Sequence, residues 1–437
     1  MSERRNIVLI TLESVRADHC NFMGYKRETT PNIDRMAERG LYFTNAIAPG
    51  GGTPSSLVGA FTGDFSLTDP ECFSPQKWKR ELSNRKTLAE VLSKIGYDTI
   101  GVTPQAFVSR YFGFNKGFKY YFDFFELEKK HLRFRSSKTV LAEKWHRKIG
   151  NMIFIASKFI TSKEPSRALK YVLWEDYYNT IIKSVNEANK PFFLWVFPHD
   201  THLLYIPPKD NRRWSNLSDL LRVTPYLIWK FWIRGETEFT LSESSKNGLI
   251  NLYDDEINYV DRLIGNLEKD LRDYDPIFVI HADHGDGFGE HGFYGHPQKL
   301  YEELIHVPLV IYNADIKGKI ENPVSLLGLA PTILKLIGEE NEFPSESFLH
   351  EGKDWVISKV FEGEKRKVAV RTKDWKFITG QKEEDELYYL KKDPHEQENV
   401  INEYPELAKE MRRIVEIHVK HEIERRRIYE RISRIKL

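Results

Sequence analysis

The chain has 437 residues, of which 41% are hydrophobic, so it can bury a large core as one big α/β domain with additions or as two domains. Its 65 basic and 64 acidic residues leave a formal net charge of +1, and nothing in this balance points to a nucleic-acid partner. The only two cysteines, Cys20 and Cys72, are too few for a disulfide scaffold or a cysteine-rich metal site, so we interpret them as reduced thiols.

The first apolar run of the chain, Ile7–Leu12, lies close to the N-terminus and is followed directly by Glu13. It is short and contains Thr11, so it fits a buried strand better than the hydrophobic region of a signal peptide. No apolar stretch approaches the roughly 20 residues that span a bilayer. We therefore expect a soluble protein that resides in the cytoplasm.

Farther along, short apolar runs alternate with helical patterns. Amphipathic patterns predict helices over residues 32–40 and 87–95, which end at Gly40 and Gly96. Apolar runs predict buried strands over residues 97–102, 192–197, 277–280 and 307–312. Unbroken apolar strands that alternate with helices favour an α/β fold with a mostly parallel sheet covered by helices.

Residues 126–244 look like an insertion into this domain. Residues 129–170 carry twelve Lys or Arg against two Glu, interleaved with aromatic residues, and Tyr226–Ile233 is again rich in aromatics. One interpretation is a set of helices packed on the main domain with a solvated basic face. The other is a lid over the site, or a surface that meets an anionic or lipid-linked substrate.

The pattern changes after about residue 345, so we divide the chain into a main domain, 1–345, and a C-terminal region, 346–437. Residues 367–378 alternate like a half-buried strand that residues 386–390 can pair with, which predicts a small antiparallel sheet. Residues 405–437 predict a long charged helix that can dock on the body or pair with a second subunit. Its predicted apolar stripe consists of Leu407, Met411, Ile414 and Ile417.

Polar side chains follow three of the predicted strands. Glu13 follows the first strand, His199 and His202 follow residues 192–197, and the Asp283-His284 pair follows residues 277–280. Ligands of open α/β sheets bind beyond the carboxyl ends of the strands, so these three groups predict a single site.

A threonine stands at the predicted start of another helix, in Gly50-Gly-Gly-Thr53-Pro54. The glycines let the backbone approach a ligand closely, and free N–H groups at a helix start favour an anion. A hydroxyl at that point would face a bound phosphate or sulfate. Taken alone, however, these residues fit a plain N-cap threonine followed by proline better.

The loop that contains Asp283, His284, His291 and His296 is dense in His, Asp and Gly. Adjacent Asp and His are hard to explain by packing, because both need partners when buried. Oxygen and imidazole ligands suit Mn²⁺, Zn²⁺, Mg²⁺ or Ca²⁺. In the cluster after residues 192–197, a histidine such as His202 can protonate a leaving oxygen or hold an anion. A loop with incidental polar residues is an equally good interpretation of this cluster.

In this order, the motifs resemble the sulfatase family of the alkaline phosphatase superfamily over most of the chain. The similar segments are Asn6–His19, Gly24–Asp34, Gly40–Ala46, Thr53–Gly63, Tyr253–Asp261, Asp283–Gly285, Leu300–Pro308, Ala330–Thr332, Val370–Lys376 and Leu387–Pro394.

The resemblance implies a metal-dependent hydrolase in which a metal-bound nucleophile attacks phosphorus or sulfur in line. It makes Glu13, Asp283 and His284 ligands of one divalent cation, and Thr53 both a ligand and the nucleophile. His202 matches the substrate-binding histidine of the family. His296 lies near the position of a second substrate-binding side chain, and Lys299 and His291 are weaker candidates for substrate binding.

Departures from the family pattern bear on the substrate. Family sulfatases mature a Cys or Ser to formylglycine within a Cys-x-Pro-x-Arg pattern, whereas this chain has Thr53, then Pro54, with Leu57 at the arginine position. Where the family has its second early Asp, this chain has Ser14. The Gly-Lys-Trp-His segment of the family is absent after Val102. The ligand set instead looks like the phosphoglycerol transferase and lipoteichoic-acid synthase branch, or like phosphodi- and monoesterases of the superfamily, which use an unmodified Thr.

We therefore expect hydrolysis of a phosphate mono- or diester. The alternatives are a sulfuric ester hydrolase, a phosphoglycerol or phosphoethanolamine-type transferase and, least favoured, a non-catalytic binding protein. The Asp-x-x-x-His pair of two-zinc phosphatases is not found near Asp200, so one metal ion is expected.

Overall fold

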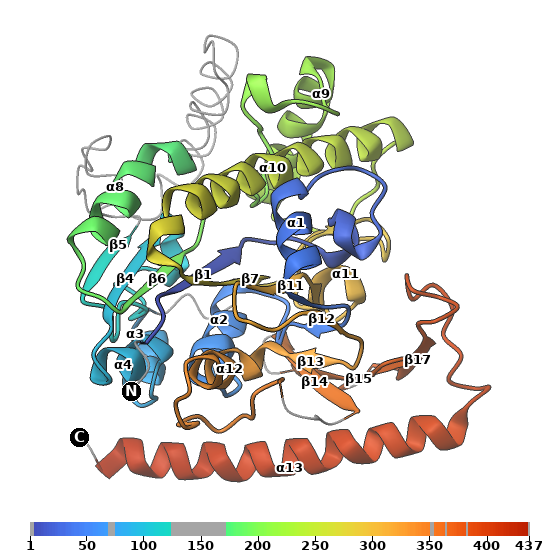
Figure 1. The fold of residues 1–437 in the computed structure, drawn as a ribbon. Helices are drawn as coiled ribbons and strands as arrows, with labels where there is room; N and C mark the ends of the chain where they lie inside the picture. Colours follow the sequence, from blue (N-terminus) through green and yellow to red (C-terminus); the bar gives the residue numbers. More distant parts are fainter. Residues whose placement is uncertain are drawn as a thin grey trace, which may run out of the picture.

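The computed structural model describes residues 4–68, 75–123, 172–349, 354–362, 365–381 and 383–435. Its centre is an eight-stranded sheet between two layers of helices (Figure 1). In spatial order the strands are β12 (Gly318–Ile320), β2 (Leu41–Phe43), β11 (Leu309–Tyr312), β7 (Ile277–Ala282), β1 (Ile7–Leu12), β6 (Phe192–Val196), β4 (Asp98–Thr103) and β5 (Tyr120–Asp123). The predicted α/β class with a mostly parallel sheet is confirmed.

Strand β1 lies in the middle of the sheet and is parallel to both of its neighbours. Ile7 is in register with Phe193 of β6 and with Ile277 of β7. Every residue of these three strands is buried, because helices cover both faces of the sheet. The continuous apolar runs therefore predicted these strands correctly, in place and in type.

The predicted strand over residues 307–312 differs from expectation. Pro308 divides it into β10 (His306–Val307) and β11, and β11 runs antiparallel to β7 and to β2. A proline lacks the N–H that a ladder needs, so the chain changes sheets at this point. Strand β10 joins a small sheet with β3 (Ala46–Ile47) and β13 (Val324–Ser325), and β8 (Gly287–Phe288) pairs with β9 (Tyr294–Gly295).

One helical layer contains α1, α8 and α10, and the opposite layer contains α2, α4 and α12 (Figure 1). The helix over 32–40 is confirmed as α1 and that over 87–95 as α4, which is capped by the Thr87 hydroxyl accepting from the Glu90 amide at 3.2 Å. The described helices are α1 (Pro31–Arg39), α2 (Thr53–Thr62), α3 (Pro75–Ser83), α4 (Leu88–Lys94), α8 (Trp174–Glu187), α9 (Leu217–Leu227), α10 (Glu243–Asp270), α11 (Glu302–Ile305), α12 (Leu329–Leu336) and α13 (Pro405–Ile435).

The predicted insertion over 126–244 is not one continuous piece. Strand β6 lies within that range and pairs with both β1 and β4 at the centre of the sheet. The basic and aromatic stretch, 129–170, lies outside the described residues, as does Cys72. Cys20 is buried with a free thiol, and its Sγ donates to the Arg16 carbonyl.

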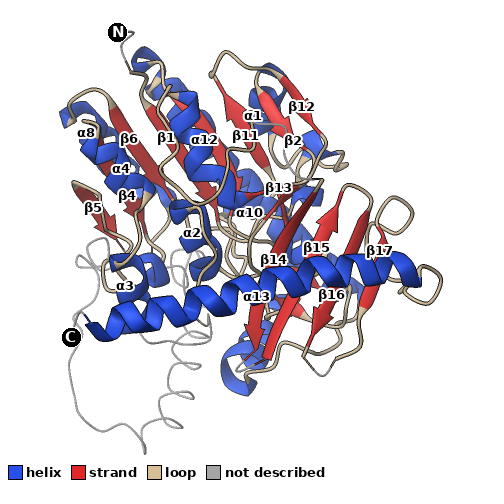
Figure 2. Ribbon diagram, turned by 90° about the horizontal axis from the view of Figure 1, so that it is seen from below, coloured by secondary structure: helices blue, strands red, loops and turns tan. Residues whose placement is uncertain are grey.

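The C-terminal region forms a four-stranded antiparallel sheet of β14 (Trp355–Glu362), β15 (Lys365–Thr372), β16 (Trp375–Gly380) and β17 (Glu386–Tyr389). Residues 367–378, predicted as one strand, are a tight hairpin in which the Trp375 amide donates to the Thr372 hydroxyl at 2.9 Å. Helix α13 runs along this sheet and continues past the main domain (Figure 2).

The packed face of α13 differs from the predicted stripe. Ala408, Met411 and Val415 are buried against the small sheet, and Leu407 and Ile414 pack at its edge. Ile417, in contrast, is 51% exposed. Since 3.6 residues make one turn, positions 408, 411 and 415 share one face, and Ile417 lies off that face.

A buried charge cluster joins the two sheets. The ammonium of Lys376 in β16 is fully buried and lies 3.1 Å from Glu302 of α11 and 2.8 Å from Glu396. Arg371 of β15 lies 3.2 Å from the same Glu302. Burial opposes ionisation of Glu302, but the two cations hold the pKa of this carboxyl well below its usual value.

We expect Lys376→Met to lower the free energy of unfolding by about 3–5 kcal/mol, because it leaves the buried Glu396 carboxylate without its cation and removes one of the two cations of Glu302. Lys373→Met is the control, since Lys373 pairs with Glu321 at the surface and should contribute less than about 1 kcal/mol. Urea unfolding measures both variants. Equal effects of the two substitutions would contradict the role assigned to the cluster.

Candidate active site and metal centre

The three polar clusters predicted from the sequence meet at one edge of the sheet. Glu13 follows β1, while His199 and His202 follow β6, and Asp283 and His284 follow β7, in the spatial order β7-β1-β6. The Thr201 hydroxyl donates to the Glu13 carbonyl at 2.5 Å and fixes the loop after β6 against the end of β1. Parallel neighbouring strands explain why residues almost 200 and 300 positions apart share this edge.

The turn after β1 has an unusual backbone. Ser14 has a φ of +55°, a left-handed conformation that non-glycine residues seldom adopt. Its amide donates to Asp283 Oδ1 at 3.0 Å, and its carbonyl accepts from the Tyr253 hydroxyl at 2.8 Å. These contacts hold the strained turn in place and connect the ends of β1 and β7 beside the site.

Thr53 begins α2 but is not its N-cap. The cap position is occupied by Gly52, so Thr53 is the first helical residue and Pro54 the second. The Ser56 hydroxyl, one turn on, donates to the Asp283 carbonyl at 2.7 Å and fixes the helix start against the β7 loop. Gly51 has to be glycine for space, since a Cβ there would lie 2.8 Å from the Lys299 carbonyl.

The Thr53 hydroxyl lies between two acceptors. Its Oγ1 is 2.9 Å from Glu13 Oε1 and 3.1 Å from His284 Nε2. His284 Nδ1 donates to the Gly285 carbonyl at 2.8 Å, which leaves a lone pair on Nε2. A hydroxyl has one hydrogen, so it cannot satisfy both Glu13 and His284.

The carboxylate of Asp283 adds a third acceptor to this group. Its Oδ1 accepts from two backbone amides, whereas its buried Oδ2 has no hydrogen-bond partner within the described parts of the chain. Burial raises the pKa of Asp283, and the nearby charge of Glu13 acts in the same direction. A buried site with more lone pairs than hydrogens is unfavourable unless a cation occupies it.

Glu13, Asp283 and His284 therefore fit one divalent cation. One ligand atom from each lies within 4.8 Å of the others, and all three side chains are buried. Two carboxylates and one imidazole suit a hard or borderline divalent metal. The structure thus brings together the four residues that the sequence assigned to the metal, Thr53 included.

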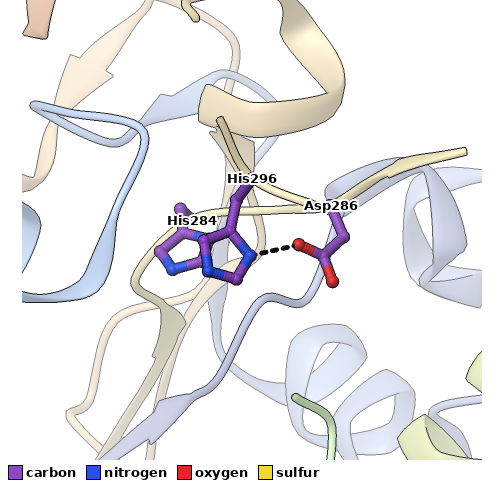
Figure 3. A group of neighbouring side chains, drawn as sticks. All are labelled: His284, Asp286 and His296. Carbon is purple, nitrogen blue, oxygen red and sulfur yellow. Dashed lines mark hydrogen bonds and ion pairs between the residues drawn. The ribbon is translucent and has the colours of Figure 1, made fainter. Parts of the chain in front are cut away.

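A second group lies beside the first and contains His284, Asp286 and His296 (Figure 3). His296 Nδ1 donates to Asp286 Oδ1 at 2.6 Å, and the Tyr205 hydroxyl donates to the other oxygen of this carboxylate. Burial opposes a charged imidazole, but the Asp286 carboxylate raises the pKa of His296 to about 9. His296 is therefore a cation next to the Thr53 site, as an anion-binding residue requires.

The pKa of His202 is shifted in the opposite direction to that of His296. Burial, together with neighbouring His199, lowers the pKa of His202 to about 3, so this ring is neutral near pH 7. Its Nδ1 donates to the Leu203 carbonyl at 2.5 Å, which leaves Nε2 as an acceptor. The rings of His202 and His296 are 5.3 Å apart. His202 lies in the site as predicted, but His296 is better suited to carry positive charge or to donate a proton.

The two weaker candidates have other partners. His291 uses both ring nitrogens, with Nδ1 2.6 Å from Glu303 and Nε2 2.9 Å from the Glu396 carbonyl, and it stacks on Tyr301. This arrangement is structural, so the contacts do not support substrate binding by His291. The Lys299 ammonium lies 3.1 Å from Glu238 and over the Phe293 ring, at the rim of the loop.

Two residues of the site, Asp286 and Tyr205, had no role in the sequence-based prediction, and His199 was predicted only as part of the cluster after the 192–197 strand. Asp286 and Tyr205 orient His296, and His199 lies 3.5 Å from Glu13 Oε2 and stacks on His202 at 4.5 Å. Asp286 lies in the Asp283-His284 loop, so its position in sequence was a signal. Tyr205 lies three residues after His202, and nothing in the sequence linked it to Asp286.

We expect Mn²⁺ to raise the thermal midpoint of the protein by roughly 2–5 °C, because a ligand that binds only the folded state stabilises it. Asp283→Asn should remove this rise. Asp261→Asn is the matched control, since Asp261 is a buried carboxylate that accepts from the Asn32 and Ile33 amides at the start of α1. Calorimetry with Mn²⁺, Mg²⁺, Ca²⁺ and Zn²⁺ checks the assignment, which fails if no ion stabilises the wild-type protein.

Comparison with known proteins shows which family the chain resembles. The sulfatase family model matches residues 5–339, and a model of the N-sulphoglucosamine sulphohydrolase C-terminal region matches residues 289–421. The chain is 27% identical to an arylsulfatase of Clostridium perfringens, over 94% of this chain and 93% of the relative. It is 22% identical to an N-acetylglucosamine-6-O-sulfatase of Bacteroides thetaiotaomicron, over 95% and 86% of the two chains.

Solved structures show the same fold. The phosphonate monoester hydrolase of Agrobacterium radiobacter superposes with a TM-score of 0.70 at 16% identity, over 96% of each chain. The family model covers most of the sequence and includes Glu13, Thr53, Asp283 and His284. The chain therefore belongs to the sulfatase family, a group of ester hydrolases.

Proposed function

We propose that the protein is a metal-dependent sulfuric ester hydrolase in which the unmodified Thr53 is the nucleophile. The main support for a hydrolytic site is the position of the Thr53 hydroxyl, 2.9 Å from the buried carboxylate of Glu13 and 3.1 Å from the buried imidazole of His284. The sulfate ester is favoured over phosphate because the curated relatives are named as sulfatases over nearly the whole chain. This choice differs from the phosphate ester expected from the sequence.

The proposed reaction has two displacements at the central atom of the ester. Thr53 Oγ1 gives its proton to Glu13 and forms a bond to that atom, while the bond to the leaving oxygen breaks. His296 holds the negative oxygens and supplies the proton that the leaving oxygen takes. Water then attacks the same atom and gives one proton to His296, the bond to Oγ1 breaks, and Oγ1 takes its proton back from Glu13.

In this reaction, other residues of the chain orient His296 and hold the divalent ion. Asp286 holds the ring of His296 through Nδ1, so the opposite nitrogen, Nε2, is the one that can face substrate. Glu13, Asp283 and His284 would hold the divalent ion, which polarises the ester and lowers the pKa of the nucleophile when bound.

A second candidate, hydrolysis of a phosphoric or phosphonic ester, is favoured by the identity of residue 53. A threonine cannot mature to formylglycine, and an unmodified hydroxyl is the nucleophile in the phosphate-cleaving branch that the ligand set resembles. The chain also shares its fold with a phosphonate monoester hydrolase, but at 16% identity this similarity does not bear on the substrate.

A panel of aryl esters separates the two candidates. The purified enzyme with Mn²⁺ is assayed on 4-nitrophenyl sulfate, 4-nitrophenyl phosphate, bis(4-nitrophenyl) phosphate and a phenylphosphonate monoester. We expect the highest kcat/KM on the sulfate. A higher value on a phosphate or phosphonate would overturn the sulfate assignment and support the second candidate.

Thr53→Ala should lower kcat by at least about 10³-fold on the best substrate of this panel, because no other hydroxyl can form the covalent intermediate. Thr53→Ser keeps the hydroxyl and should retain measurable activity. Both variants should keep the thermal rise with metal to a larger extent than Asp283→Asn. Full activity of Thr53→Ala would exclude Thr53 as the nucleophile.

His296→Ala should lower kcat by about 10²-fold, in the range found for loss of a general acid. His291→Ala is the matched control, because it removes a histidine from the same loop whose ring is hydrogen-bonded elsewhere, and it should leave kcat within a few-fold of wild type. Steady-state kinetics on the best aryl ester measures both variants. A larger loss in His291→Ala would reverse the roles given to these two histidines.

A further inference from the structure

An exposed apolar stripe runs along α9 and the helical turn η5 (Ile228–Arg234), which stand out from the main domain above α10 (Figure 1). Leu217 and Leu221, one turn apart, are 56% and 49% exposed, and Trp229 and Trp232 are 41% and 54% exposed. These four residues, here called the α9–η5 stripe, are four of the ten large hydrophobic side chains that are exposed in the described structure. Such clustering marks an interaction site.

Basic side chains accompany the stripe. Residues 209–236 contain six Lys or Arg and three Asp or Glu, a local charge of +3, whereas the whole chain carries only +1. Lys230 Nζ lies 5.0 Å from the Trp229 ring, and the Arg234 guanidinium lies 5.9 Å from it. Both cations pair with the same carboxylate, Glu236, at 2.7 and 2.9 Å, so this group keeps one net positive charge. Exposed tryptophans with cations beside them are typical of segments that lie in the headgroup region of an anionic bilayer.

The base of this element is attached to the loop that carries His296. Phe231 lies against Gly295, where an added Cβ would come within 3.3 Å of its ring. Phe239 stacks on Tyr294 at 4.5 Å, and the Tyr294 amide donates to the Thr237 carbonyl at 2.8 Å. The stripe therefore extends from the rim of the catalytic site rather than from a remote face.

We propose that the α9–η5 stripe docks the protein on the surface of an anionic lipid bilayer, and that the substrate is the charged ester headgroup of an amphiphile in that bilayer. The second half of this inference rests on the proposed esterase function, and the first half does not. The net positive charge beside the two tryptophans is complementary to an anionic lipid surface, and tryptophan with basic neighbours is typical of segments in the headgroup region. None of the described helices has the length and hydropathy of a membrane span.

Vesicle binding tests the docking. The full-length protein is sedimented with vesicles of phosphatidylcholine alone and of phosphatidylcholine with 30% phosphatidylglycerol. We expect binding to the anionic vesicles with a blue shift of tryptophan fluorescence, and at least about tenfold weaker binding to the neutral ones. Equal binding to both vesicles, or no binding to either, would overturn the proposal.

The double variant Trp229→Ala/Trp232→Ala should lose at least about tenfold in affinity for anionic vesicles. The control is Tyr111→Ala/Tyr404→Ala, which removes two aromatic side chains with 55% and 42% exposure elsewhere on the surface and should bind as wild type does. Thermal midpoints establish that both variants fold. Equal affinity of the two double variants would overturn the assignment to the stripe.

Two further measurements distinguish the possible failures. Activity on the soluble aryl esters should be unchanged in Trp229→Ala/Trp232→Ala, so loss of vesicle binding with retained turnover supports docking independently of catalysis. Vesicle binding without turnover of any ester would reject the esterase function and leave docking standing. Sedimentation velocity tests a second copy as occupant, and a dimer that the double variant converts to monomer would overturn the lipid assignment.

Discussion

The site depends on an excess of buried lone pairs over hydrogens around one hydroxyl. Thr53 can donate to Glu13 or to His284 but not to both, and the second oxygen of Asp283 lies beside them with no partner in the described structure. Two carboxyl groups and an imidazole, all at 0% exposure, are unfavourable by themselves. The strained turn at Ser14 and the hydrogen bond from Ser56 keep these groups together. The folded chain thus holds a set of buried ligand atoms that a cation would stabilise.

The positive charge of the site lies on one histidine, His296, beside the group of Glu13, Asp283 and His284. His202 and His296 have similar burial and lie close to each other, yet their pKa values move in opposite directions. Only His296 has a carboxylate, Asp286, whose second oxygen is held by Tyr205. A neutral acceptor and a charged donor can thus lie on the same side of a tetrahedral anion without both requiring a proton.

Much of this could be predicted from the sequence, for identifiable reasons. Strands β1, β6 and β7 are buried on both faces, so their apolar runs are unbroken, and the polar residues after them had to meet at one edge. Other features depend on tertiary contacts that leave no local pattern. The reversal of β11 follows from a proline that moves the chain between sheets, and the hairpin at 372–375 is hidden because the alternation continues through it. The different roles of His296 and His291 arise from Asp286 and Glu303, and in sequence each histidine lies nearer to the carboxylate that pairs with the other one.

The buried Lys376 has a consequence for how the chain can be divided. Its two carboxylate partners come from α11, which follows the His296 loop, and from the segment after the small sheet. A chain that ended near residue 345 would therefore keep the acidic side chain of Glu302 beside the catalytic loop and lose both cations that neutralise it. The small sheet thus supplies the counter-charge of a buried carboxylate in the main domain, and removing that sheet would leave Glu302 without Lys376 and Arg371.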